Sequence, residues 1–275
     1  MLICQLTDLH VRPVGQSANR LVETNTLTER AFRSVARFTP TPDVVIITGD
    51  LNECGLDPEY ANVAALLRKW LPMPVYVVPG NHDRRENLRQ GLAHLPGVTA
   101  DPVYVQYAID DFPVRLVMLD TVVPGSGHGE LRPEQLAFLD RTLAAVPDKP
   151  TLLAMHHPPF ACGIAHMDRI NLHNAAAFAD LVARHPQVEL IICGHHHRPI
   201  VTRVAHAIAS ISPSVAHQVE MSLDPKDPGA WLFEPPAWQL HRWTPADGIV
   251  SHTVYVEDHP GPFPFVNDPQ YPGKS

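Results

Sequence analysis

The chain has 275 residues, of which 45% are hydrophobic and 18% are charged, as in an ordinary globular protein. Its formal net charge is −8, which argues against double-stranded nucleic acid or an anionic membrane surface as the main partner. A small anionic substrate remains compatible with this charge, because bound metal ions reverse its sign locally.

Six short apolar runs along the chain predict buried strands, and each leads into residues that bind metals well. In chain order the runs cover residues 2–6, 44–48, 75–78, 114–119, 152–155 and 190–193. They lead into Asp8 and His10, Asp50, the Gly-Asn-His-Asp turn at 80–83, Asp120, His156, and the Gly-His-His-His run at 194–197. If the strands share a sheet, these side chains meet at one edge, where open α/β sheets place their sites.

Helical patterns alternate with these strands and predict an α/β protein with helices on the faces of a sheet. We expect helices over 26–38, where Thr26 and Glu29 form a capping-box pattern, over 57–70, from Pro133, and from Asn174 as N-cap. The predicted catalytic core covers residues 1–212.

The composition changes after the core. Residues 213–247 hold many prolines and three of the four tryptophans, which indicates either a cap over the site or an ordinary irregular connection. Residues 248–275 are expected to add a final core strand and an extended Pro-rich tail. The four cysteines are scattered and support neither a disulfide framework nor a zinc ribbon. We find no signal-like or membrane-spanning run and expect a cytoplasmic protein.

Seven residues form the candidate metal centre. They are Asp8, His10, Asp50, Asn81, His156, His195 and His197. Asp8 and His10 are two residues apart, as are His195 and His197, so each pair shares one side of an extended strand. Gly49, directly before Asp50, permits close backbone approach. Oxygen and nitrogen donors without thiolate suit Fe, Mn, Co or Zn.

These motifs carry a resemblance to a known family. The blocks DLH, GDLN, GNHD, an isolated His before Pro, and GHHH resemble the ordered motifs of calcineurin-like metallophosphoesterases over roughly residues 1–200. The chain is most similar to the bacterial glycerophosphodiesterase and class III cyclic-nucleotide phosphodiesterase branches. The resemblance implies a four-layer αββα sandwich, here with a small C-terminal cap region.

The resemblance also implies a role for each residue. Asp8, His10 and His197 would bind one divalent or trivalent metal ion. Asn81, His156 and His195 would bind the second, and Asp50 would bridge the two. His82 would face the substrate phosphate as the catalytic residue. Asn81 and His82 are expected to contact substrate, as is His217 from its place in the predicted cap.

The predicted function is hydrolysis of small-molecule phosphodiesters, of glycerophosphodiester type, by in-line attack of a metal-bound hydroxide. The alternative is a 3',5'-cyclic-nucleotide phosphodiesterase. A non-catalytic scaffold is disfavoured because all seven ligands are present. We expect no nucleic acid polymer and no membrane as partner. The aromatic, Pro-rich tail predicts a homodimer or larger homo-oligomer.

Neighbouring residues lead to weaker predictions. Asp83 is expected either to orient His82 or to cap the following helix, and Glu53 is a candidate hydrogen-bond partner of His82. His157 is expected either to support a metal ligand by a hydrogen bond or to be structural, and not to bind metal itself. Cys54 resembles a position used for contact between subunits in the glycerophosphodiesterase branch, but the tail offers no partner cysteine.

Overall fold

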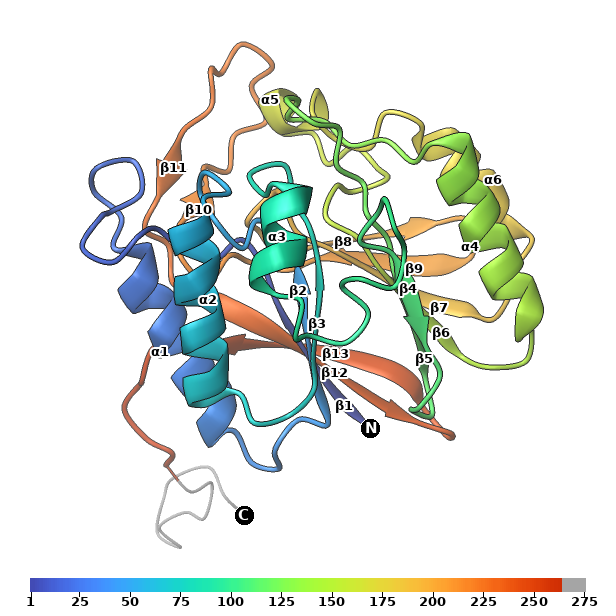
Figure 1. Cartoon of the computed structure of the whole chain (residues 1–275), viewed down its shortest axis with the longest axis horizontal. Coiled ribbons are helices and arrows are strands. Elements are labelled where there is room, and N and C mark those ends of the chain that lie inside the picture. The colour runs from blue at the N-terminus through green and yellow to red at the C-terminus, as the bar shows by residue number, and fades with distance from the viewer. Residues whose placement is uncertain (264–275) are drawn as a thin grey trace, which may run out of the picture.

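The computed structural model describes residues 1–263, so residues 264–275, which hold most of the predicted tail, lie outside the description. Two mixed sheets form the centre of the molecule (Figure 1). The first has the order β13-β12-β1-β2-β3, and the second has the order β4-β5-β6-β7-β9-β8. A third, two-stranded sheet pairs β10 (Gln218–Val219) with β11 (Trp231–Leu232).

In the first sheet, β1 (Leu2–Leu6), β2 (Val44–Thr48) and β3 (Val75–Val78) are parallel. β12 (Ala237–Thr244) pairs antiparallel with β1 and with β13 (Gly248–Tyr255). The prediction that residues 237–244 belong to the cap is wrong, because they form β12 of the first sheet. The prolines of 213–247 predict an irregular segment, but none of them lies within residues 237–244.

In the second sheet, four strands are parallel: β5 (Arg115–Met118), β6 (Thr151–Ala154), β7 (Val188–Cys193) and β9 (Ala207–Ile211). β4 (Tyr107–Ile109) and β8 (Ile200–Val204) run antiparallel at its two edges. The carboxyl ends of the parallel strands of each sheet meet at one edge, as predicted for the site.

Helices cover the outer faces of both sheets. α1 (Thr24–Arg37), α2 (Asp57–Trp70) and α3 (Arg85–Gly91) lie on one side of the molecule, and α4 (Pro133–Ala145) and α6 (Ala175–Ala183) on the other (Figure 1). The short α5 (Ala165–Asp168) packs against β10, where Met167 and Val219 belong to one small hydrophobic cluster. None of the helices in residues 1–263 is long and apolar enough to cross a bilayer.

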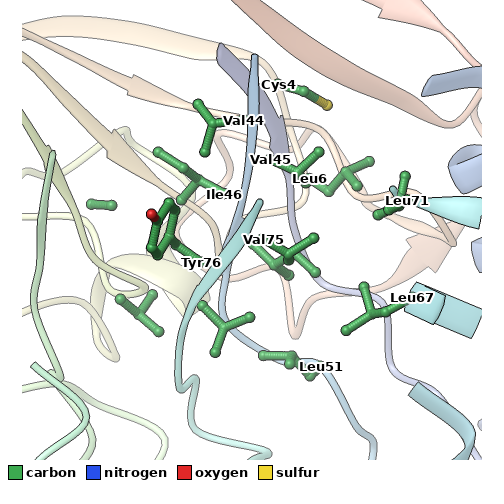
Figure 2. Packing of buried hydrophobic residues seen from close by; sticks show 14 of the residues in the cluster. Cys4, Leu6, Val44, Val45, Ile46, Leu51, Leu67, Leu71, Val75 and Tyr76 are labelled. Atoms are coloured by element: carbon green, nitrogen blue, oxygen red, sulfur yellow. The ribbon is translucent and has the colours of Figure 1, made fainter. Parts of the chain in front are cut away.

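Side-chain alternation along the strands builds the layers. In β5, Leu116 and Met118 join the core that includes the first sheet, whereas Val117 belongs to the core that includes α4 and α6. Figure 2 shows the same alternation in the first sheet, where Val45 and Val75 lie on the side of Leu67 and Tyr76 points to the opposite side. The four-layer αββα sandwich is therefore confirmed.

Two predicted helix starts differ in detail. α1 begins at Thr24, after Glu23 as N-cap, and has no side-chain cap, so the capping box at Thr26 and Glu29 is wrong. Asn174 does stand at the N-cap of α6, but its amide exchanges hydrogen bonds with the backbone of Leu131. The Asn174 side chain therefore ties α6 to the loop before α4.

Candidate metal centre

The candidate donors follow the carboxyl ends of β1, β2, β6 and β7, together with the turn after β3, and the two sheets bring them together. Five of the seven have positive φ: Asp8 (52°), His10 (48°), Asp50 (47°), His195 (73°) and His197 (53°). Left-handed backbone is uncommon outside glycine and persists only where surrounding structure holds it. The pairs Asp8/His10 and His195/His197 therefore lie in left-handed loop backbone. The prediction that each pair shares one side of an extended strand is wrong.

Glycines permit this convergence. A Cβ atom on Gly49, whose φ is +94°, would lie 2.4 Å from Nδ1 of His156. A Cβ atom on Gly80 would lie 2.2 Å from Oδ1 of Asp50. Both contacts are too short for any side chain, so the sequence requires glycine at each position.

The first group of donors contains His10, His197 and Asp8. Nδ1 of His10 bonds Oε2 of Glu53 at 2.7 Å, and Nδ1 of His197 bonds the backbone oxygen of His217 at 2.8 Å. Because both oxygens accept, each Nδ1 carries a hydrogen and each neutral ring presents a lone pair at Nε2. The two Nε2 atoms are only 3.2 Å apart, and Nε2 of His197 lies 3.2 Å from Oδ1 of Asp8.

Two imidazole lone pairs and a carboxylate facing one another at these distances need a positive charge between them. A proton on one ring supplies it in the metal-free chain, and a metal ion fits the same donor set. The residues present therefore suit a cation at this position.

The second group contains His156, Asn81 and His195. His156 donates from Nδ1 to the backbone oxygen of Thr48 at 2.8 Å, and its Nε2 lies 3.1 Å from Oδ1 of Asn81. His195 bonds the backbone oxygen of Ile170 through Nε2 at 3.1 Å, so its Nδ1 is the available ligand atom. The rings of His156 and His195 lie 5.0 Å apart.

Asp50 lies between the two groups. Its Oδ2 is 3.8 Å from Nε2 of His10 and 3.3 Å from Nε2 of His156, and its Oδ1 accepts the backbone N–H of His82 at 2.9 Å. Burial opposes ionisation of this carboxyl, but His156 and His82 outweigh burial and hold the pKa of Asp50 well below its usual range. Burial likewise lowers the pKa of His156, but Asp50 outweighs it and raises that pKa to about 9. An ionised Asp50 is suited to bridge two cations.

His82 lies beside the donors. Its ring is edge-on to His10 at 4.8 Å, and its Nδ1 donates to the backbone oxygen of Glu53 at 2.8 Å, so Nε2 remains available. The pairing of Glu53 with His82 thus uses the backbone. The Glu53 carboxylate instead orients His10, a role the sequence prediction missed.

Two further acidic residues, Asp83 and Asp120, make contacts that differ from those predicted. Asp83 accepts the backbone N–H groups of Gly80 and Leu51 at 2.9 and 3.1 Å and the hydroxyl of Tyr60 at 3.1 Å. It therefore holds the GNHD turn, and neither of its predicted roles is correct. Asp120 forms a two-pronged ion pair with Arg85 at 2.6 and 2.9 Å, so this strand end is separate from the donors.

His157 and His217 are both buried near the donors. Nδ1 of His157 bonds the hydroxyl of Thr121 at 2.7 Å, and its Nε2 bonds the backbone oxygen of Gly127 at 3.2 Å. His157 is thereby occupied on both nitrogens. The His217 ring lies 4.8 Å from the His197 ring, and its buried Nδ1 has no hydrogen-bond partner within the described residues.

A pocket of about 230 Å³ opens over the donors. Its wall consists of His10, Asn19, Asp50, Glu53, Asn81, His82, Met167, Ile170, His195, His197, His217 and Val219. The Trp231 ring lies edge-on to the His217 ring, with their centroids 5.5 Å apart. The Phe233 ring lies edge-on to Trp231, with their centroids 5.4 Å apart. The other two tryptophans of the expected cap lie in β12, where Trp238 is fully buried.

Comparison with known proteins places this geometry in context. A family model described as calcineurin-like phosphoesterase matches residues 1–199. A probable glycerophosphodiester phosphodiesterase from Arcobacter nitrofigilis is 35% identical over 269 residues, covering 98% of both chains. A 3',5'-cyclic adenosine monophosphate phosphodiesterase from Pseudomonas aeruginosa is 30% identical over 240 residues, covering 84% of this chain and 85% of the relative.

A solved structure shares the fold. The dimetal phosphatase from Danio rerio superposes with a TM-score of 0.64 at 17% sequence identity, covering 94% of this chain and 99% of the other.

Proposed function

The chain belongs to the calcineurin-like phosphoesterase family, and from its donor geometry we propose that it is a two-metal hydrolase of small-molecule phosphodiesters, of glycerophosphodiester type. The observation that carries the proposal is Asp50, whose one oxygen faces His10 on one side and His156 on the other. A carboxylate oxygen that faces nitrogen donors on two sides is suited to bridge a pair of cations.

Each donor has a proposed assignment. Asp8, His10 and His197 hold one ion, Asn81, His156 and His195 hold the other, and Asp50 bridges them. When bound, two metal ions supply a nucleophile from water near neutral pH and neutralise charge on the attacking and leaving oxygens. The donor set admits Fe, Mn, Co or Zn.

His82 is the proposed catalytic residue. Its Nδ1–H is held by Glu53, so Nε2 is the nitrogen that meets substrate in the pocket. Burial lowers the pKa of His82, but Asp50 and Glu53 together outweigh burial, and the net shift is upward. A more basic imidazole is more often protonated, and a protonated ring stabilises phosphate charge and donates to the leaving oxygen. Asn81 and His217 are proposed to contact the substrate beside it.

The pocket supports a compact substrate. Its volume of about 230 Å³ is below the roughly 300–1,000 Å³ of pockets for drug-sized ligands. We propose that the segment carrying His217, Trp231 and Phe233 acts as a cap that limits the leaving group. Glycerol is smaller than a nucleoside, so this wall favours glycerophosphodiesters over polymers.

The alternative is a cyclic-nucleotide phosphodiesterase, which the Pseudomonas aeruginosa relative supports by name. A substrate panel at defined metal loading tests the choice: glycerophosphocholine, glycerophosphoethanolamine, cyclic AMP and a phosphomonoester. We expect the largest kcat/KM for the glycerophosphodiesters. A larger value for cyclic AMP would favour the alternative. The homo-oligomer and the cytoplasmic location stay predictions, and light scattering tests the first.

A further inference from the structure

A second cluster of metal-binding side chains lies beside the proposed centre. Cys162, Asp168 and His196 each offer one ligand atom, and these atoms lie within 4.8 Å of one another. Sγ of Cys162 is 3.1 Å from Nδ1 of His196. The cluster contains sulfur, whereas the donors assigned to the two-metal centre are nitrogen and oxygen alone.

His196 is held in the form that a metal ligand needs. Its Nε2 bonds Oδ1 of Asn171 at 2.6 Å. The Asn171 amide cannot be turned around, because its Nδ2 donates to the backbone oxygen of Phe160 at 2.8 Å and to Asp168 at 3.3 Å. Oδ1 therefore accepts, Nε2 of His196 carries the hydrogen, and the lone pair of Nδ1 faces Sγ.

Hydrogen bonds also hold the loop around Asp168 in place before any ion binds. The Asp168 carboxylate accepts the backbone N–H groups of Cys162 and Gly163 at 2.8 and 2.9 Å. With the bond from Asn171, three of its roughly four acceptor positions are used, which leaves one for a cation. The Cys162 backbone is thus hydrogen-bonded to the same carboxylate that would bind the ion together with the Cys162 side chain.

We propose that Cys162, Asp168 and His196 form a third cation site, separate from the two-metal centre, for one thiophilic divalent ion such as Zn²⁺. Tetrahedral zinc, with Zn–S of about 2.3 Å and Zn–N of about 2.0–2.1 Å, separates these ligand atoms by roughly 3.5 Å. The observed 3.1 Å between sulfur and nitrogen is close to that spacing. Three protein ligands leave a fourth position for water.

Binding exchanges a proton for the ion. Burial, and then Asp168, raises the pKa of the Cys162 thiol to about 11, so without a cation the thiol keeps its hydrogen and donates it to His196. Zn²⁺ coordinates the thiolate, and the displaced proton passes to solvent. Cys162 is partly exposed, which gives the ion a route in. Mg²⁺ prefers oxygen ligands and is not expected here.

Two short stretches of the chain connect this cluster to the proposed two-metal centre. His196 stands between His195 and His197, and Asn171 follows Ile170, whose backbone oxygen holds His195 at 3.1 Å. An ion bound at Cys162 therefore braces the turn that carries two of the proposed ligands.

Cobalt substitution tests the proposal with a signal independent of catalysis. We expect the full chain to bind three Co²⁺ ions and to show sulfur-to-cobalt charge-transfer absorption in the ultraviolet. Cys162→Ser should bind two ions and lose the absorption. The matched control Cys54→Ser, which removes an exposed cysteine outside the cluster, should keep both. Absorption that is missing from the wild type, or that persists in Cys162→Ser, would overturn the proposal.

A second measurement leaves the cluster unaltered. In the Cys54→Ser protein, Cys162 is the remaining thiol that is not buried, since Cys4 and Cys193 are in the core. Zn²⁺ should slow its alkylation by iodoacetamide at least tenfold, while Mg²⁺ should not. An alkylation rate unchanged by saturating Zn²⁺ would contradict the site, even if the protein hydrolyses diesters normally.

Discussion

Four imidazole rings at the proposed centre each bond an oxygen on the side away from the other donors. The pairs are His10 with the Glu53 carboxylate, and His156, His195 and His197 with the backbone oxygens of Thr48, Ile170 and His217. Each bond fixes the tautomer and aims the opposite nitrogen inward. Three of the four oxygens belong to the backbone, so sequence patterns alone could not reveal them.

Glu53 is the one orienting group that a substitution can remove. Glu53→Ala should free the His10 ring and weaken metal binding at its side of the centre by about 10–100-fold, the usual effect of losing such a partner. Glu53→Gln keeps an acceptor oxygen for Nδ1 of His10 and should stay close to wild type. Isothermal titration with Mn²⁺ measures both. Equal affinity in the Ala and Gln variants would show that the carboxylate does not position His10.

His82 should matter for rate and not for metal content. His82→Ala leaves the seven proposed ligands in place, so both ions of the two-metal centre should still bind. The hydrolysis rate should fall by about 10²–10⁴, the range for a positioned acid–base group. Elemental analysis and steady-state kinetics with bis-p-nitrophenyl phosphate check the two expectations. A collapse in metal content would make His82 a ligand and refute its proposed role.

At the scale of elements, the strand ends were the most predictable part of the fold. β1, β2 and β3 match the predicted 2–6, 44–48 and 75–78, because short buried apolar runs closed by polar residues have few other interpretations. The left-handed residues Asp8 and His197 were not predictable, since non-glycine residues adopt that conformation only when tertiary packing imposes it.

β12 shows why the predicted boundaries of the cap failed. Its residues Trp238, Leu240 and His241 are buried, and the strand pairs with β1. A histidine within a Trp-rich stretch flanked by prolines does not form the apolar pattern that predicts a buried strand. His241 bonds Ser251 at 2.7 Å and Gln5 at 3.1 Å, so its neutral ring is satisfied inside the sheet. A linker replacing 213–247 would delete this strand, and tests of the cap must therefore use point substitutions.

His241 leads to a pH prediction. Burial, followed by His252, lowers the pKa of His241 to about 3 from 6.5. Between these values only the unfolded chain binds the proton, so His241 contributes stability above pH 6.5 that is lost as pH falls toward 3. From pH 6.5 to about pH 5 the loss should be about 2 kcal/mol, at roughly 1.4 kcal/mol per unit.

Urea unfolding of the metal-free protein at several pH values measures this loss. The variant His241→Gln cannot take up the proton, so its free energy of unfolding should fall less steeply between the same two pH values. The comparison uses slopes, so any constant cost of the substitution cancels. Parallel slopes for wild type and variant would mean that His241 is protonated in the folded state.

At the scale of the whole molecule, the centre exists because two sheets face each other. Asp8 and Asp50 follow strands of the first sheet, while His156 and His195 follow strands of the second. The order of motifs predicted that these residues meet. That one oxygen of Asp50 faces both His10 and His156 could not be predicted, because it depends on how the sheets are placed against each other.

The central claim is that Asp50 joins two metal ions into one catalytic centre. Asp50→Ala removes the shared carboxylate and leaves two cations facing each other with less compensation. Metal content and hydrolysis of bis-p-nitrophenyl phosphate, measured together on wild type and Asp50→Ala, test the claim most directly. We expect two ions and activity at the centre in wild type, and loss of the pair with nearly all activity in the variant. Full activity with the paired ions still bound in Asp50→Ala would contradict the account.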